Sequence, residues 1–174
     1  MSRFVVTNAG PLMVFSKLNV LHLFKELYGI LHFTQGVYLE TVTKGMRQGT
    51  PDAHSLQMFL KQHCWSPTTV KEIPADLMNL HLDLGERESI ALALPRNALL
   101  LMDEERGRAV ARNRNLQVKG SLGVMVEAFR GGLISFHQIQ FYFQQIAHRP
   151  DIWISPSLCK CILDEISSEY DCLT

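Results

Sequence analysis

Ala98-Leu99-Leu100-Leu101-Met102-Asp103-Glu104 is the stretch that decides the fold, because five apolar residues run directly into two acids. An apolar run this short, between two helical patterns, predicts a parallel strand that is buried on both faces. In open α/β sheets, functional residues lie at the carboxyl ends of such strands. We therefore expect Asp103 to stand where a buried strand delivers a charge to solvent.

Strand and helix patterns alternate along the chain on both sides of this stretch. Strands are expected at residues 4–6, 30–34, 98–102 and 116–119, and helices at 11–18, 20–28, 36–49, 56–60, 84–94, 104–115 and 120–129. Residues 65–73 fit either an edge strand or a loop. The alternation implies right-handed βαβ crossovers. It predicts a three-layer α/β/α sandwich with a mainly parallel sheet, in a domain spanning residues 1–135.

Residues 136–174 are expected to form a C-terminal helical extension packed on the same domain. Apolar residues at helical spacing mark the first helix, and Ser155 before Pro156 is typical of the start of a second. The apolar stripes are Phe136, Ile139, Phe143 and Ile146, then Leu158, Ile162 and Ile166. These stripes either pack on the domain's own sheet or form an interface for a second subunit or a partner.

Composition describes a globular chain without a global charge signature. The 174 residues carry 17 basic and 17 acidic side chains, so any polyanion must be met by a local patch. No apolar run approaches the roughly 20 residues of a membrane span. The N-terminus lacks a signal-peptide apolar core, which predicts a cytoplasmic protein that meets no membrane.

The four cysteines fit the same reducing compartment. They are Cys64, Cys159, Cys161 and Cys172. Cys159 and Cys161 have no second cysteine pair or histidine pair at zinc-finger spacing, so they are expected to be small residues on a C-terminal helix.

Acids near strand and helix ends suggest a site for a divalent metal ion, because Mg²⁺ and Mn²⁺ prefer oxygen ligands and bridge phosphate. Each acid also has a simpler explanation. Asp103 fits the N-cap of the next helix, and Glu104 fits a favourable charge at that helix start. Glu86 and Glu88 lie in the first turn of their helix, where the helix dipole alone explains them. Glu40 fits a solvated helix face.

Basic residues gather in segment 104–119, where five of them outnumber Glu104 and Glu105. Arg108 and Arg112 are one helical turn apart on one face. Beside an acidic strand end, they are candidates to contact a phosphate backbone. Any single arginine here also fits a solvated helix face.

No other catalytic motif competes with the acids. The chain has no G-x-S-x-G, no G-x-x-x-x-G-K-[ST] and no H-E-x-x-H. A nucleotide-binding regulatory α/β domain would need a phosphate loop, and Gly120-x-x-Gly123 is too little for one.

Five blocks, in this order along residues 3–135, resemble prokaryotic PIN-domain proteins, and among them the uncharacterised PIN-like group related to VapC-type toxins. The blocks are Val5-Val6-Thr7-Asn8-Ala9-Gly10-Pro11-Leu12, Val37-Tyr38-x-Glu40, Leu84-Gly85-Glu86-x-Glu88-x-Ile90-Ala91-Leu92-Ala93, Leu101-Met102-Asp103-Glu104-x-x-Gly107-Arg108-x-x-Ala111 and Val118-x-Gly120-Ser121-Leu122-Gly123-Val124.

The resemblance implies an Mg²⁺- or Mn²⁺-dependent endoribonuclease specific for single-stranded RNA, often the toxin of a toxin–antitoxin pair. Carried over by position, the acidic quartet that binds the metal and catalyses the reaction is Asn8, Glu40, Glu88 and Asp103. The implied partners are RNA, an antitoxin protein and a second copy of the chain. The rival hypothesis is an inactive PIN-like module that binds RNA or a protein.

Asn8 departs from the family pattern, in which Asp ends the first strand. Asparagine is still an oxygen donor, but it removes one negative charge, so weaker metal affinity and slower hydrolysis are expected. This asparagine is either native to the branch or a change that silences a toxic nuclease. It also fits a simple turn residue before Gly10-Pro11.

Overall fold

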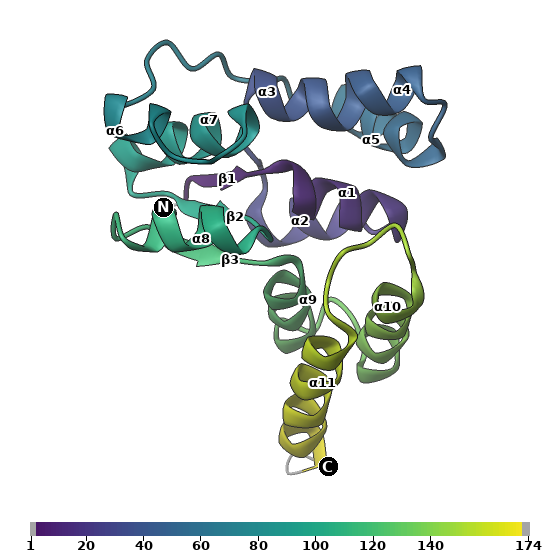
Figure 1. Cartoon of the computed structure of the whole chain (residues 1–174). Coiled ribbons are helices and arrows are strands. Elements are labelled where there is room, and N and C mark those ends of the chain that lie inside the picture. Colours follow the sequence, from purple (N-terminus) through teal and green to yellow (C-terminus); the bar gives the residue numbers. More distant parts are fainter. Residues whose placement is uncertain (1–2, 172–174) are drawn as a thin grey trace. The chain divides into compact units, whose positions relative to one another are not determined.

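The structure is a computed structural model that describes residues 3–171. It contains two compact units, the first running through Ser121 and the second beginning at Leu122. The first unit holds the sheet, and the second is helical (Figure 1). The predicted boundary at residue 135, and the packing of residues 136–174 on the same domain, stay predictions.

Three parallel strands form the sheet, in the order β1 (Val5–Thr7), β2 (Leu99–Leu101) and β3 (Gln117–Lys119). The opening stretch therefore provides the central strand, and the predicted α/β fold with a parallel sheet is confirmed. Every residue of β1 and β2 is at most 2% exposed. Because successive side chains of a strand point to opposite faces, both faces of these strands are covered.

The strand expected at residues 30–34 is reduced to a single bridge between His32 and Val6. The amide of Thr7 donates to the His32 carbonyl, and the His32 amide donates to Val5. The pairing stops there because Gly29 turns with a φ of 73° just before it, while Thr34 caps the next helix. Residues 65–73 form a loop with one bridge, from Thr68 to Thr34.

Helices surround the sheet in the first unit, and α7 packs against β1 and β2 while α8 packs against β3. Their bounds are α1 (Ala9–Lys17), α2 (His22–Tyr28), α3 (Gln35–Tyr38), the π-helix η1 (Leu39–Lys44), α4 (Gly45–Arg47), α5 (Pro51–Gln62), α6 (Ala75–Met78), α7 (Leu84–Ala93), the 3₁₀ turn η2 (Leu94–Arg96) and α8 (Glu105–Arg112).

Gly45 does not interrupt the helix expected over residues 36–49. The chain stays helical from α3 through η1 and α4. This helical run ends near Gly49, which has a φ of 69°. Gly45 instead allows close packing, because a Cβ on it would lie 2.5 Å from the Cβ of Ala53 on α5. This continuous run carries Glu40 within the π-helix, a local form often found at functional sites.

The second unit contains α10 (Phe136–His148) and α11 (Pro156–Asp171), with α9 (Ser121–Arg130) starting at the last residue of the first unit. α10 opens with a capping box in which Ser135 and Gln138 satisfy each other's backbone amides. Ile139, Phe143 and Ile146 are buried, as their spacing predicts.

Cys159 lies inside the α10–α11 pair, and burial raises the pKa of its thiol. Leu158, expected on the buried stripe, is 45% exposed instead, because Cys159 occupies the inward position. Cys64 and Cys161 are exposed free thiols, and Cys172 lies outside the described residues. None of the helices in residues 3–171 is both long and apolar enough to cross a membrane.

Candidate active site

The carboxyl ends of β1 and β2 bring Asn8 and Asp103 to the same edge of the sheet. Asn8 follows β1 directly, and its backbone amide donates to the carbonyl of Leu101, the last residue of β2, at 2.8 Å. Asp103 lies two residues after Leu101. The sequence prediction that the central strand delivers Asp103 to this edge is therefore confirmed by the pairing of the strands.

Asp103 is held by Ser121 at the start of α9. The Ser121 amide donates to Asp103 Oδ1 at 2.7 Å, and its hydroxyl donates to Oδ2 at 2.6 Å. Burial raises the pKa of the Asp103 carboxyl, while the Ser121 hydrogen bonds and the Arg108 charge oppose that rise. The N-cap of α8 is Glu104, so the alternative role of Asp103 as that cap is wrong.

Asn8 is 1% exposed and uses both ends of its amide. Its Nδ2 donates to Glu104 Oε2 at 3.2 Å, and its Oδ1 receives a long hydrogen bond of 3.4 Å from Ser89. Asn8 stands at the N-cap position of α1, but its side chain bonds to Glu104 and Ser89 and not to a backbone amide of that helix. The amide thus places Glu104 beside the strand ends.

Glu104 turns its carboxyl toward Asp103. A Cβ placed on Gly10 would lie 3.1 Å from Glu104 Oε1 and 3.2 Å from Asp103 Oδ2. Although much of residue 104 is exposed, its carboxyl lies in this crowded place. Loss of hydration therefore raises its pKa, and the nearby Asp103 and Asp83 charges raise it further.

Three oxygens from three separate segments meet in front of Gly85. A Cβ placed on Gly85 would lie 3.4 Å from each of Asn8 Oδ1, Glu40 Oε2 and Asp83 Oδ1. Any two of these oxygens are therefore separated by no more than twice that distance. We use the name Gly85 point for the position that this Cβ would occupy.

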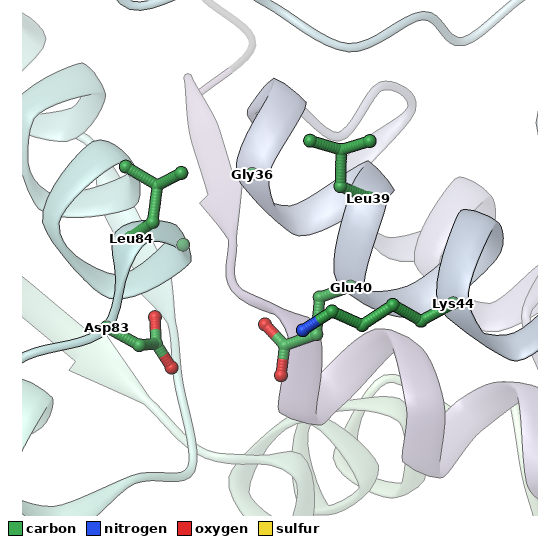
Figure 2. A pocket seen from close by; sticks show the side chains of 7 residues that line it. Gly36, Leu39, Glu40, Lys44, Asp83 and Leu84 are labelled. Atoms are coloured by element: carbon green, nitrogen blue, oxygen red, sulfur yellow. The ribbon is translucent and has the colours of Figure 1, made fainter.

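Glu40 reaches the Gly85 point from the π-helix η1, so it is not simply on a solvated face. Burial raises the pKa of its carboxyl, the charges of Asp83, Glu104 and Glu86 raise it further, and the charge of Lys44 lowers it. Figure 2 shows the carboxylates of Glu40 and Asp83 pointing toward one another across a pocket. We refer to Glu40, Asp83, Glu86, Asp103 and Glu104 as the acid cluster.

Glu88, by contrast, is turned to another partner. Its Oε2 accepts a hydrogen bond of 2.8 Å from the Gly36 amide at the start of α3. No Glu88 oxygen is among the three atoms nearest to the Gly85 point. The structure therefore brings Asn8 and Glu40 together and places Asp103 at the adjoining strand end, while the fourth predicted residue ties α7 to α3.

Asp83 and Glu86 are the acids that sequence reasoning missed or explained otherwise. Asp83 accepts from the Glu86 amide at 2.7 Å, and Glu86 accepts from the Asp83 amide at 2.8 Å. Burial raises the pKa of Glu86 most strongly. The spacing Asp83-x-x-Glu86 is a capping-box signal. It could have located both residues at the helix start, although not their proximity to Glu40.

A family model described as a PIN domain matches residues 4–168 of this chain. The chain belongs to the PIN-domain family. The match includes α10 and most of α11, so the family pattern extends past residue 135. Comparisons with curated proteins and with solved structures found no match. Membership indicates a nuclease or nucleic-acid-binding function, and it confirms that the five sequence blocks are those of a PIN domain.

The oxygens at the Gly85 point suit a hard divalent cation, because such ions prefer carboxylate and amide oxygens and because the neighbouring carboxylate charges repel one another. Within residues 3–171, no three Asp, Glu, His or Cys side chains are grouped so that they could hold an ion by themselves. The closest set of oxygens includes the neutral amide of Asn8.

Arg108 lies beside Asp103 in this PIN fold. A Cβ on Gly120 would lie 3.0 Å from Asp103 Oδ1 and 3.3 Å from Arg108 Nη1. In the described part of the chain, the buried Nε of Arg108 has no hydrogen-bond partner. Arg112 is exposed in the last turn of the same helix. A cationic donor thus stands beside Asp103.

Proposed function

We propose that this PIN domain is a metal-dependent endoribonuclease that cleaves single-stranded RNA at the acid cluster. The observation that carries the proposal is the meeting of Asn8, Glu40 and Asp83 oxygens at the Gly85 point, next to a strand-end aspartate. Oxygen donors gathered from several segments are what Mg²⁺ or Mn²⁺ needs in order to bind protein and phosphate together.

The proposed cofactor is Mg²⁺ or Mn²⁺, held by Asn8, Glu40 and Asp83, with Asp103 and Glu104 adjoining. Asp83 replaces Glu88 in the set expected from the family pattern, because the Glu88 carboxylate is occupied at Gly36. When bound, the ion supplies positive charge to the phosphate and lowers the pKa of a water molecule.

The chain's own residues then position the substrate and move a proton. Ser121 fixes Asp103, so this carboxylate keeps one orientation during the reaction. Glu104, whose pKa is raised, is suited to accept a proton from the attacking water at Oε1. Arg108 and Arg112 lie on α8, where their guanidinium groups can donate to phosphate oxygens of the RNA.

Cleavage of fluorescently labelled single-stranded RNA, with and without Mn²⁺, tests the proposal. The parent protein should cleave only with the ion, and Asp103→Asn should reduce the rate by roughly 10²–10³-fold. Duplex RNA should be cut more slowly than single strands. Equal activity of Asp103→Asn and the parent would show that the assignment is wrong.

The second candidate is a PIN module that binds RNA or protein without turnover, and the neutral Asn8 favours it. Asn8→Asp separates the two. In a weakened nuclease, the added charge should increase Mn²⁺-dependent cleavage, because it strengthens ion binding at the Gly85 point. A pure binding module should gain no cleavage from the same change.

The family resemblance also supports a biological proposal. We propose that the nuclease acts in the cytoplasm as the toxin of a toxin–antitoxin pair, with an antitoxin protein and a second copy of the chain as partners. Expression in a bacterial host should then arrest growth, and Asp103→Asn should relieve the arrest. Growth arrest that is equal in both would contradict a toxic nuclease.

A further inference from the structure

A cavity of about 250 Å³ opens directly beside the Gly85 point. It lies between the α3–η1 segment and the start of α7 (Figure 2). A Cβ on Gly36 would stand 3.4 Å from the Cα of Gly85, so these two glycines, which both line the cavity, let α3 and α7 approach each other closely. Pockets for drug-sized ligands begin at about 300 Å³. The cavity therefore has room for one ring system.

Two apolar side chains flank the cavity. Leu39 is 43% exposed and Leu84 is 52% exposed, and Figure 2 shows them on opposite sides of the pocket. A single exposed leucine needs no explanation. A pair that faces a common space beside an acid cluster offers two apolar surfaces to a flat ligand.

The other end of the cavity is polar. Asp83 and Glu40 supply carboxylate oxygens, and Lys44 supplies an ammonium group near Glu40 (Figure 2). A phosphate would meet two like charges here and only one cation. A flat heterocycle that carries N–H donors and a ring acceptor would instead satisfy both kinds of group.

We infer that this cavity binds one unstacked base of the single-stranded RNA, next to the phosphate that is cleaved, and that it prefers a base with an exocyclic amino group. The inference rests on the proposed function, because it takes the same RNA as the ligand. The base lies between Leu39 and Leu84. Its amino group donates to Asp83 Oδ2, the oxygen of this carboxylate that does not lie at the Gly85 point, and Lys44 donates to a ring nitrogen or carbonyl oxygen.

Cytosine and uracil give the sharpest comparison, because they differ mainly in the groups at ring positions 3 and 4. Cytosine presents an amino donor, which carboxylates accept. Uracil presents a carbonyl oxygen, which two carboxylates repel. Fluorescence anisotropy should therefore show labelled oligo(C) binding roughly tenfold more tightly than oligo(U). Measurement in EDTA prevents metal-dependent cleavage during the titration.

Three variants test the walls of the cavity. Leu39→Ala and Leu84→Ala should each weaken oligo(C) binding by roughly fivefold, because they remove apolar contact with the base. Met58→Ala is the matched control, since Met58 is 66% exposed on α5 and does not line the cavity. Asp83→Asn should shift the preference toward oligo(U), because an amide can donate to the uracil carbonyl. Asparagine is as good an N-cap as aspartate, so α7 should still form.

Equal binding of oligo(C) and oligo(U) by the parent would overturn the inference, as would losses in Leu39→Ala and Leu84→Ala no larger than in Met58→Ala. Neither result would contradict the proposed nuclease activity, which is tested separately by Mn²⁺-dependent cleavage. A parent that prefers oligo(C) but never cleaves would retain the base site and refute the nuclease. Failure of Asp83→Asn to change the preference would contradict the assigned hydrogen bond.

Discussion

The acid cluster has a sheet side and a helix side, and the two are built differently. On the sheet side, Asp103 follows the central strand, and both of its oxygens accept hydrogen bonds from Ser121. On the helix side, Glu40 lies in a π-helix, and its carboxylate accepts no hydrogen bond from any residue in 3–171. The Asp103 carboxylate on the sheet side is therefore held in place without a ligand. The Glu40 carboxylate on the helix side has no such partner, and a bound cation would neutralise its charge.

Gly85→Ala is the change expected to affect this comparison most. The new methyl group would lie 3.4 Å from oxygens of Asn8, Glu40 and Asp83, an ordinary contact that needs no backbone shift. It would fill the point where both sides meet, so RNA cleavage should fall by at least about tenfold. Alanine is also the better helix former, so stability should rise by up to about 1 kcal/mol.

Cleavage assays and thermal unfolding of the same preparations check this prediction. A loss of activity that accompanies a lower melting temperature would indicate a packing defect instead of a filled site. Unchanged cleavage would show that the Gly85 point takes no part in the reaction.

The sheet side could be predicted from sequence, and the helix side only in part. Five apolar residues before Asp103 identify a buried strand, and strand order then places that acid at the functional edge. The position of Glu40 depends on how η1 packs beside α7, which no local pattern reports, so only family resemblance pointed to it. Asp83 is a true helix cap. Because this capping role fully explains an aspartate at position 83, the sequence gives no reason to expect its carboxylate beside Glu40.

The charge of the helix side should appear in the pH dependence of stability. Burial and neighbouring acids raise the pKa of Glu40 above its ordinary value of 4.5 in the folded chain. The folded state therefore binds the proton more tightly than the unfolded state, and stability falls as pH rises through the raised pKa. As the pH rises from about 4.5 to about 8, the parent's melting temperature should decrease more than that of Glu40→Gln.

The measurement compares the melting temperatures of the parent and Glu40→Gln at each pH. This comparison removes the contribution of His32, which changes stability with pH in the opposite direction and is the same in both proteins. Burial, and then the Arg96 charge, lowers the pKa of His32, so this residue favours the fold at higher pH. Mn²⁺ should raise the melting temperature of the parent more at about pH 8 than at about pH 5.5, since protons compete with the ion. An equal pH response in Glu40→Gln and the parent would contradict an unneutralised helix side.

Glu88→Gln should have the smallest effect. It tests whether Glu88 takes part in the reaction together with Glu40 and Asp83, the acids on the helix side. Glutamine retains a side-chain oxygen that can accept from the Gly36 amide, so the contact between α7 and α3 should survive. Stability should change by less than about 0.5 kcal/mol, and cleavage should stay within about twofold of the parent. Glu88→Ala should instead cost about 1 kcal/mol, because it leaves that amide without its acceptor. If Glu88→Gln lost much more than twofold in cleavage, Glu88 would belong to the reacting set despite its bond to Gly36. The family-derived quartet would then describe this chain better than the oxygens gathered at Gly85.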